Sequence, residues 1–159
     1  MMTKLARIVL PLWLVAIVLL CFLPQGVYPN LKDFSTPGII QIGQVYMLPT
    51  PFNSLVNGGQ VETLAGLGYV LLQNLTNVFL LYPLVLSCLI LFENWRSLKR
   101  VIFYSFLISL GIETTQLVLD LLINAGRVVE IDDLWTNTLG GYLAYLTYQL
   151  ISKKFSSWL

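Results

Sequence analysis

The chain has 159 residues, of which 57% are hydrophobic and only 11% are charged, and its formal net charge is +1. Soluble domains carry about a quarter charged residues, so this composition excludes an ordinary soluble domain and predicts a multi-pass membrane protein. The length fits one domain, residues 1–159, and the near-neutral charge gives no reason to expect a nucleic-acid partner. Histidine, the commonest general base and metal ligand, is absent, and we expect neither a metal ion nor another cofactor.

Four apolar segments predict an all-α membrane protein with four transmembrane helices. The first covers residues 8–23, and no signal-peptidase site follows it, so we interpret it as an uncleaved span. The charge-free residues 63–92 exceed one upright span, and we divide them into a short interfacial or re-entrant helix, 61–72, and a second span, 74–92. Pro83 is expected to kink that span. The third and fourth spans cover residues 101–123 and 134–151.

The segments between these spans differ in character. Residues 24–61 contain five prolines and five glycines, which predicts a long irregular loop folded back on the membrane surface. The turns at 93–100 and 124–132 are short. Seven lysine and arginine residues lie in the two terminal segments and the 93–100 turn, and two lie in the 24–61 loop and the 124–132 segment. The positive-inside rule therefore places both termini in the cytoplasm and the 24–61 loop outside. The seven are Lys4, Arg7, Arg96, Lys99, Arg100, Lys153 and Lys154, and the two are Lys32 and Arg127.

Polar residues gather in the last two spans. Glu113 and Gln116 share one face of the third, and Asp133, Asn137 and Gly140 share one face of the fourth. At a rise of 1.5 Å per residue, Glu113 lies roughly 12–15 Å below the outer boundary, a depth that overlaps the polar face of the fourth helix. Insertion scales assign a central aspartate a cost of about 2.5–3.5 kcal/mol, so a carboxyl group at this depth suggests a functional site.

The turn between these spans adds Arg127 and Glu130. Arg127 is the only nearby cation, and its planar guanidinium suits a carboxylate or a phosphate. Structural interpretations compete with the functional one: Glu113 and Gln116 could clamp two helices by hydrogen bonds, and Asp132 suits a solvated helix N-cap. Gly140 or its neighbour Gly141, together with Ala144, offers a surface for close helix approach. The oxygen ligands would suit magnesium, calcium or manganese, but no recognised metal motif is present.

At these residues the sequence resembles the VanZ-like family of bacterial membrane proteins, whose namesake is linked to teicoplanin resistance. The family pattern is E-x-x-Q in one span, followed by R-x-x-D-x-x-D-x-x-x-N-x-x-G. The resemblance covers residues 45–150 and includes the segment 50–52, but Leu81 and Val85 stand where the family has an aromatic residue and a glycine. Here the pattern reads Glu113, Gln116, Arg127, Glu130, Asp133, Asn137 and Gly140, with Asn77 and Pro83 matching a motif in the second span.

The resemblance implies the bacterial cytoplasmic membrane and an association with resistance, and three functions remain open. The first is a membrane factor that lowers susceptibility to lipoglycopeptides such as teicoplanin by binding an envelope lipid, a lipid-linked precursor or the antibiotic itself. The second is an enzyme acting on an envelope lipid or polymer, with Glu113 and Asp133 as candidate catalytic carboxyl groups. The third is a proton-coupled lipid transporter, which would need a homodimer to form a pathway.

Overall fold

The structure is a computed structural model that describes residues 2–25, 36–61 and 63–154. Residues 26–35 of the expected loop, including Lys32, lie outside the described residues. Within these described residues the elements are five α-helices, two single-turn 3-10 helices (Gly58–Gln60 and Glu93–Trp95) and three short strands. They are α1 (Met2–Phe22), β1 (Ile40–Ile42), β2 (Val45–Leu48), α2 (Asn53–Val56), α3 (Leu64–Leu91), α4 (Leu98–Ile123), β3 (Val128–Glu130) and α5 (Ile131–Lys154).

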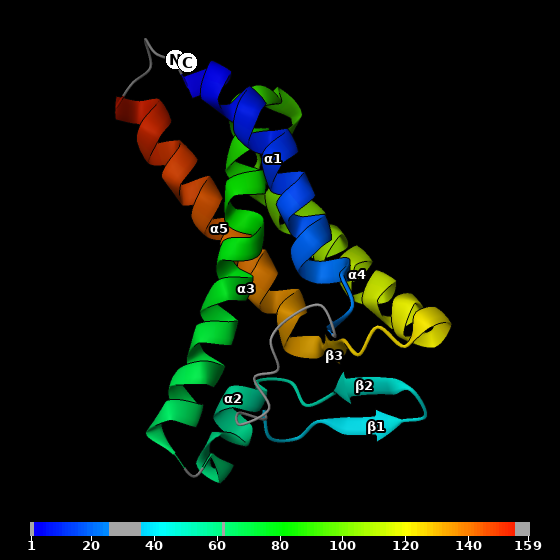
Figure 1. The fold of residues 1–159 in the computed structure, drawn as a ribbon. Helices are drawn as coiled ribbons and strands as arrows, with labels where there is room; N and C mark the ends of the chain where they lie inside the picture. Colours follow the sequence, from blue (N-terminus) through cyan, green and yellow to red (C-terminus); the bar gives the residue numbers. More distant parts are fainter. Residues whose placement is uncertain (1, 26–35, 62, 155–159) are drawn as a thin grey trace.

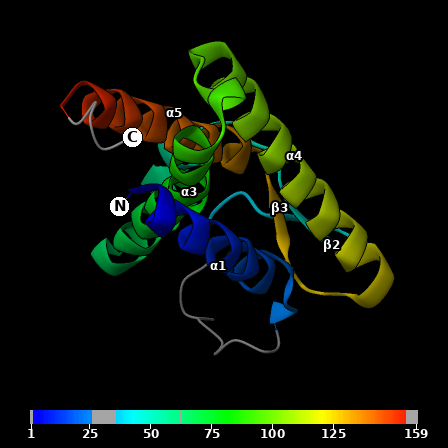
Figure 2. The ribbon, with the colours of Figure 1, turned by 90° about the horizontal axis from the view of Figure 1, so that it is seen from above.

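The four long helices form a bundle with the chain termini at one end and the strands at the other (Figure 1). Helix α3 lies centrally and packs against α1 and α5, while α4 packs mainly against α5. The view along the bundle places α3 between α1 and α5 (Figure 2). The core near the termini is apolar and closely packed, because Leu81, Val85, Leu89 and Ala144 are all 0% exposed.

Within the described residues, three helices are long and apolar enough to cross a membrane: α1, α3 and α4. Their apolar side chains point outward as well as inward, which is expected where lipid replaces water as the solvent. Helix α5 does not meet the same criterion, although it has 24 residues and runs within the bundle. The expected fourth span therefore stays a prediction. The polar residues of its first two turns are Asp132, Asp133, Thr136, Asn137 and Thr138.

The expected division of residues 61–92 into a short helix and a separate span is wrong. One continuous helix of 28 residues, α3, replaces both, and Thr63 caps it by accepting a hydrogen bond from the Gly66 amide at 3.0 Å. We placed the break beside polar residues 73 and 74, but neither ends the helix. Their side chains instead donate to Glu130 and to Ser54 of α2, so they are polar because they make tertiary contacts.

Part of the expected irregular loop is also ordered as a small sheet, so the chain is not purely α-helical. Strands β1 and β2 form an antiparallel hairpin, with Gly43 in its turn at φ +62°, a conformation that glycine adopts without strain. β2 then pairs in parallel with β3, which occupies the expected 124–132 turn. The register pairs Tyr46 with Val128 and Leu48 with Glu130. This pairing joins two connecting segments that are far apart in the sequence.

Asp132 attaches the loop to the bundle. Its two carboxylate oxygens accept the main-chain amides of Phe52 and Asn53, at 2.6 and 2.8 Å, where α2 begins. Sequence analysis assigned Asp132 a capping role in a solvated turn. The residue does cap a helix, but it is buried and the helix it caps is α2 rather than its own. A buried carboxylate that accepts two N–H groups fixes the start of α2 against α5.

Glycines on α5 allow its neighbours to approach closely. A Cβ atom on Gly140 would lie 1.9 Å from the carbonyl oxygen of Val78 on α3, and one on Gly141 would lie 2.0 Å from Ser105 Oγ on α4. The small-residue surface predicted for this helix is therefore present, and it serves two helices at once. Cys21 and Cys88 are both free.

Candidate functional site

The inward face of α4 is polar along most of its length. The buried polar residues are spaced four, four, three and four apart, so they form one stripe along the helix. The outward face carries apolar side chains such as Phe103, Phe106 and Leu110. A helix that is polar inside and apolar outside suits a lipid environment, and it supplies the bundle with its buried acids. The stripe consists of Ser105, Ser109, Glu113, Gln116 and Asp120.

Glu113 lies at the centre of the stripe and is 5% exposed. Its Oε2 accepts the main-chain amide of Glu130 at 3.0 Å, and its carboxyl group interacts with that of Asp133. Its other oxygen, Oε1, is buried without a hydrogen-bond donor. The three acids predicted from the sequence are thus brought together, and no Lys or Arg of the described chain forms an ion pair with them.

Glu130 closes one side of this group at the end of β3, where it is 8% exposed. Gln73 Nε2 on α3 donates to Glu130 Oε1 at 2.6 Å, and Gln73 Oε1 accepts from Thr36. Burial, reinforced by the negative charges of Asp133 and Asp132, raises the pKa of Glu130 to about 8, although the Gln73 hydrogen bond opposes the shift. Glu130 is therefore largely uncharged at neutral pH.

Asp133 lies in the first turn of α5 and connects three helices. Asn77 of α3 donates its amide to Asp133 Oδ1, and the main-chain carbonyl of Asp133 accepts from Ser109 Oγ on α4 at 3.0 Å. The Asn137 amide also donates to Ser109 Oγ, at 2.9 Å, while its Oδ1 has no donor. Asn137 thus extends the polar contacts away from the acids into the α4–α5 interface.

The end of α1 accepts hydrogen bonds from the opposite side of the site. Carbonyl groups at a helix C-terminus have no partner within the helix, so they need donors from elsewhere. Gln116 Nε2 donates to the Cys21 carbonyl at 3.0 Å, and the Arg127 guanidinium donates through Nε and Nη2 to the Leu23 carbonyl. The Arg127 amide in turn donates to Asp120 Oδ1 at 2.9 Å.

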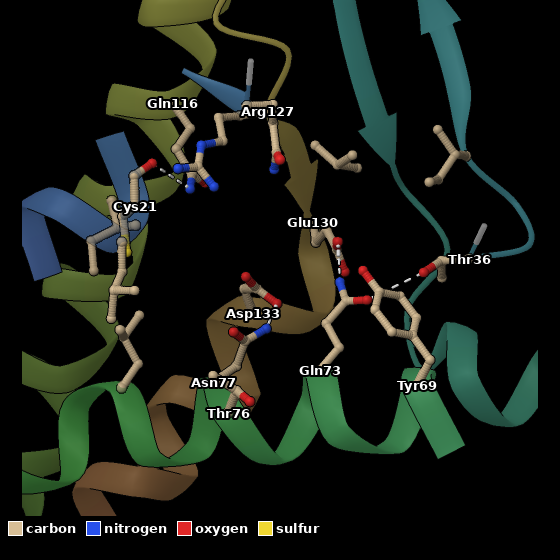
Figure 3. Close-up of a pocket in the computed structure, with 16 residues that line it drawn as sticks. Cys21, Thr36, Tyr69, Gln73, Thr76, Asn77, Gln116, Arg127, Glu130 and Asp133 are labelled. Atoms are coloured by element: carbon tan, nitrogen blue, oxygen red, sulfur yellow. Dashed lines mark hydrogen bonds between the residues drawn. The ribbon is translucent and has the colours of Figure 1, made fainter. Parts of the chain in front are cut away.

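These groups surround a cavity of about 380 Å³ between α1, α3, α4 and β3 (Figure 3). We name it the acid–amide cavity because carboxyl and amide side chains form its polar wall. Leu20, Leu80 and Ile112 add an apolar wall, so a ligand would meet both kinds of surface. The polar wall consists of Gln25, Thr36, Tyr69, Gln73, Thr76, Asn77, Gln116, Arg127, Glu130 and Asp133.

The predicted site residues divide into two groups. Four line the cavity: Gln116, Arg127, Glu130 and Asp133. The other three lie beside it. Glu113 supports Glu130 and Asp133 from α4, Asn137 lies between α4 and α5, and Gly140 lies against the backbone of α3.

Sequence analysis missed Gln73, which makes the shortest hydrogen bond to Glu130. A signal was available, because Gln73 and Asn77 are four residues apart in a charge-free helix and therefore share one face. Asn77 matched the family motif but was not assigned to the site. Together these two amides bring α3 into a site that the sequence predicted from the last two spans and the turn between them.

No group of three or more His, Cys, Asp or Glu side chains with metal-binding geometry occurs among residues 2–25, 36–61 and 63–154. The arrangement can do two things. It can bind a polar group inside a membrane protein, through oxygen acceptors and amide donors. It can also hold a proton on a carboxyl group beside that ligand, since Glu130 is protonated near neutral pH.

A model of the VanZ/LLP1 family matches residues 10–152, nearly the whole chain. The chain belongs to the VanZ/LLP1 family. The match extends the resemblance seen in residues 45–150 to include α1, whose C-terminal end forms part of the cavity. Together with the three apolar helices, membership in the VanZ/LLP1 family makes this a membrane protein. Neither a curated protein nor a solved structure matches the chain significantly.

Proposed function

We propose that this VanZ/LLP1 protein lowers bacterial susceptibility to lipoglycopeptide antibiotics such as teicoplanin by binding the headgroup of an envelope lipid or lipid-linked precursor in the acid–amide cavity. The association with resistance comes from the VanZ-like resemblance. The binding role is supported by one structural observation: acid and amide side chains surround a cavity of about 380 Å³ instead of packing solidly. A pure helix clamp would fill this space with side chains.

The proposed orientation places this cavity at the outer surface of the cytoplasmic membrane. The strands lie toward the end of the bundle opposite the start of α1 and the end of α5 (Figure 1), and Val128 and Glu130 of β3 line the cavity. With both termini in the cytoplasm, as the distribution of Lys and Arg favours, the cavity faces the side on which teicoplanin acts. The antibiotic or a lipid of the outer leaflet could then reach it without crossing the membrane.

The test compares teicoplanin susceptibility of a deletion host that carries wild type, Asp133→Asn or Gln73→Leu. Both variants alter cavity-lining residues, and we expect protection to be lost while the protein accumulates normally. The matched control is Glu93→Gln, because Glu93 is exposed, pairs only with Arg96 and lies at the end of α3 remote from the cavity. Normal accumulation with full protection in both variants would refute the proposal.

A second function is favoured by one specific contact. The carboxyl groups of Glu113 and Asp133 interact, and Glu113 Oε1 has no donor, as in a pair that shares or transfers a proton. An enzyme acting on an envelope lipid would use this pair for acid–base catalysis. Glu113→Gln separates the two functions: it abolishes protection if the pair is catalytic and only reduces protection if the cavity binds a headgroup.

A further inference from the structure

Four donor side chains around the acid–amide cavity make hydrogen bonds to acceptors of the protein itself. The side-chain amide of Gln73 donates to Glu130, that of Asn77 donates to Asp133, and that of Gln116 donates to the Cys21 carbonyl. The Arg127 guanidinium turns two of its nitrogens toward the Leu23 carbonyl. Each of these four side chains therefore directs N–H groups at a protein acceptor.

Acceptors, in contrast, remain available. Gln116 lines the cavity and is 8% exposed, and its Oε1 has no hydrogen-bond donor. The carboxyl group of Glu130 receives one side-chain hydrogen bond, from Gln73 on Oε1, so its second oxygen has no side-chain donor; that of Asp133 accepts from Asn77 on Oδ1 and also interacts with Glu113. Leaving a buried acceptor without a donor costs free energy, and a ligand that brings donors would recover it.

We propose that the acid–amide cavity binds a primary ammonium group on the headgroup of an envelope lipid, held by Gln116 Oε1 and by the carboxylates of Glu130 and Asp133. This inference rests on the proposed function, since it takes the cavity as the binding site, and it specifies the ligand chemistry. A primary ammonium has three N–H donors and no acceptor, which complements a wall that has surplus acceptors. It also brings one positive charge to a group of acids that lacks a paired cation.

The same inventory disfavours other headgroup chemistry. A phosphate or a carboxylate brings only acceptors and negative charge to a wall that already has both in excess. A quaternary ammonium brings the positive charge but no N–H donor, so it would leave Gln116 Oε1 unsatisfied. Arg127 lies on the far side of the cavity from Gln73 and Asn77 (Figure 3), and its guanidinium donates to the Leu23 carbonyl.

The raised pKa of Glu130 agrees with this assignment. The carboxyl group stays protonated near neutral pH because burial and nearby negative charge oppose its ionisation. A bound ammonium supplies the opposite charge, so the ionised form becomes favourable and a proton is released. Binding at pH 7 should therefore be accompanied by proton release, which can be detected by calorimetry in buffers with different ionisation enthalpies.

The experiment uses the full chain, purified in a neutral detergent, and measures its thermal unfolding midpoint and tryptophan fluorescence during lipid titrations. The probes are dihexanoyl phosphatidylethanolamine, dihexanoyl phosphatidylcholine and dihexanoyl phosphatidylglycerol. They share the phosphate and chains and differ in carrying a primary ammonium, a quaternary ammonium or no amine. We expect the ethanolamine lipid to bind at least about tenfold more tightly than the other two, a difference of about 1.4 kcal/mol.

Variants locate the effect. Gln116→Met and Asp133→Asn should each remove most of the preference for the ethanolamine lipid, while Glu93→Gln should retain it. Equal affinity for the three lipids, or a preference for phosphatidylglycerol, overturns the proposal. So does an equal rise in the unfolding midpoint with magnesium chloride alone, since the site would then take a metal cation.

The two proposals can fail separately. If the ethanolamine preference is absent but Asp133→Asn still abolishes teicoplanin protection, the headgroup assignment is wrong and the proposed function stands. If the preference is present and depends on Gln116 and Asp133, yet Asp133→Asn leaves protection intact, the ammonium site is real and the proposed function is wrong.

Discussion

The two ends of α5 lie in different surroundings. Its second half packs into the apolar core, where Ala144 is 0% exposed and Tyr148 is buried. Its first half carries Asp132, Asp133 and Asn137 into the polar end of the bundle, where Asn137 is fully buried but keeps an oxygen without a donor. The side chains of the apolar half are buried by packing, whereas the polar half contains a buried acceptor that has no donor. We infer that the first determines stability and the second determines what the protein binds.

The largest effect is expected from Gly140→Ala, which tests the close packing of α5 against α3 between the two ends. The added methyl group would collide with the backbone of α3 at Val78, and backbone cannot move aside as a side chain can. We expect a loss of more than about 3 kcal/mol of stability, seen as low folded yield or a lower unfolding midpoint in detergent. Gly68→Ala on α3 is the matched control, because nothing lies within 4 Å of the added atom. Equal stability of the two variants would contradict the close α3–α5 contact.

Asp132→Asn should have the next largest effect, and it acts where the loop joins the bundle. The charged group now accepts two main-chain amides, from Phe52 and Asn53, and an asparagine can accept fewer and more weakly. We expect a loss of about 2–3 kcal/mol. Limited proteolysis should show cleavage within residues 49–61 before the bundle unfolds. Unchanged protection of that segment would show that the cap is unimportant.

Glu130→Gln tests the polar half through its pH dependence. The folded protein holds a proton on Glu130 up to a pKa of about 8, whereas the ordinary value is 4.5. The folded state therefore binds more protons between these values, and its stability falls as pH rises from about 4.5 to 8. We expect Glu130→Gln to reduce this decline in the unfolding midpoint between pH 5 and 8. The same decline in wild type and variant would assign it to other groups.

The smallest effect is expected from Ser109→Ala, at the boundary between the two halves. Ser109 Oγ donates to the Asp133 carbonyl and accepts from the Asn137 amide. Removing it should cost about 1 kcal/mol for each net hydrogen bond lost, measurable as a small shift of the unfolding midpoint. A loss as large as that of Gly140→Ala would mean that the polar contacts between α4 and α5 contribute as much stability as the close packing of α5 against α3.

The helices were largely predictable from the sequence because lipid-spanning segments are long and apolar. The E-x-x-Q and R-x-x-D patterns also identified Gln116, Arg127 and Asp133, since a buried polar residue in an apolar helix is conspicuous. The break near residue 73 was predicted wrongly because residues 63–92 exceed one upright span, whereas a single long helix can accommodate the extra length by tilting. The small sheet was missed because its strands have only three or four residues, and β2 pairs with a partner in a distant segment.

The parallel pairing of β2 with β3 constrains the order in which the protein can be built. Phe52 and Asp132, which anchor the same region, are 80 residues apart in the chain, and α3 and α4 lie between them. During synthesis β2 therefore emerges long before β3, and it stays unpaired on that edge until α3 and α4 have been made. The complete sheet, the cap on α2 and the wall formed by Glu130 assemble last, so a ribosome that stalls before β3 leaves three long helices without α5 and without the cavity.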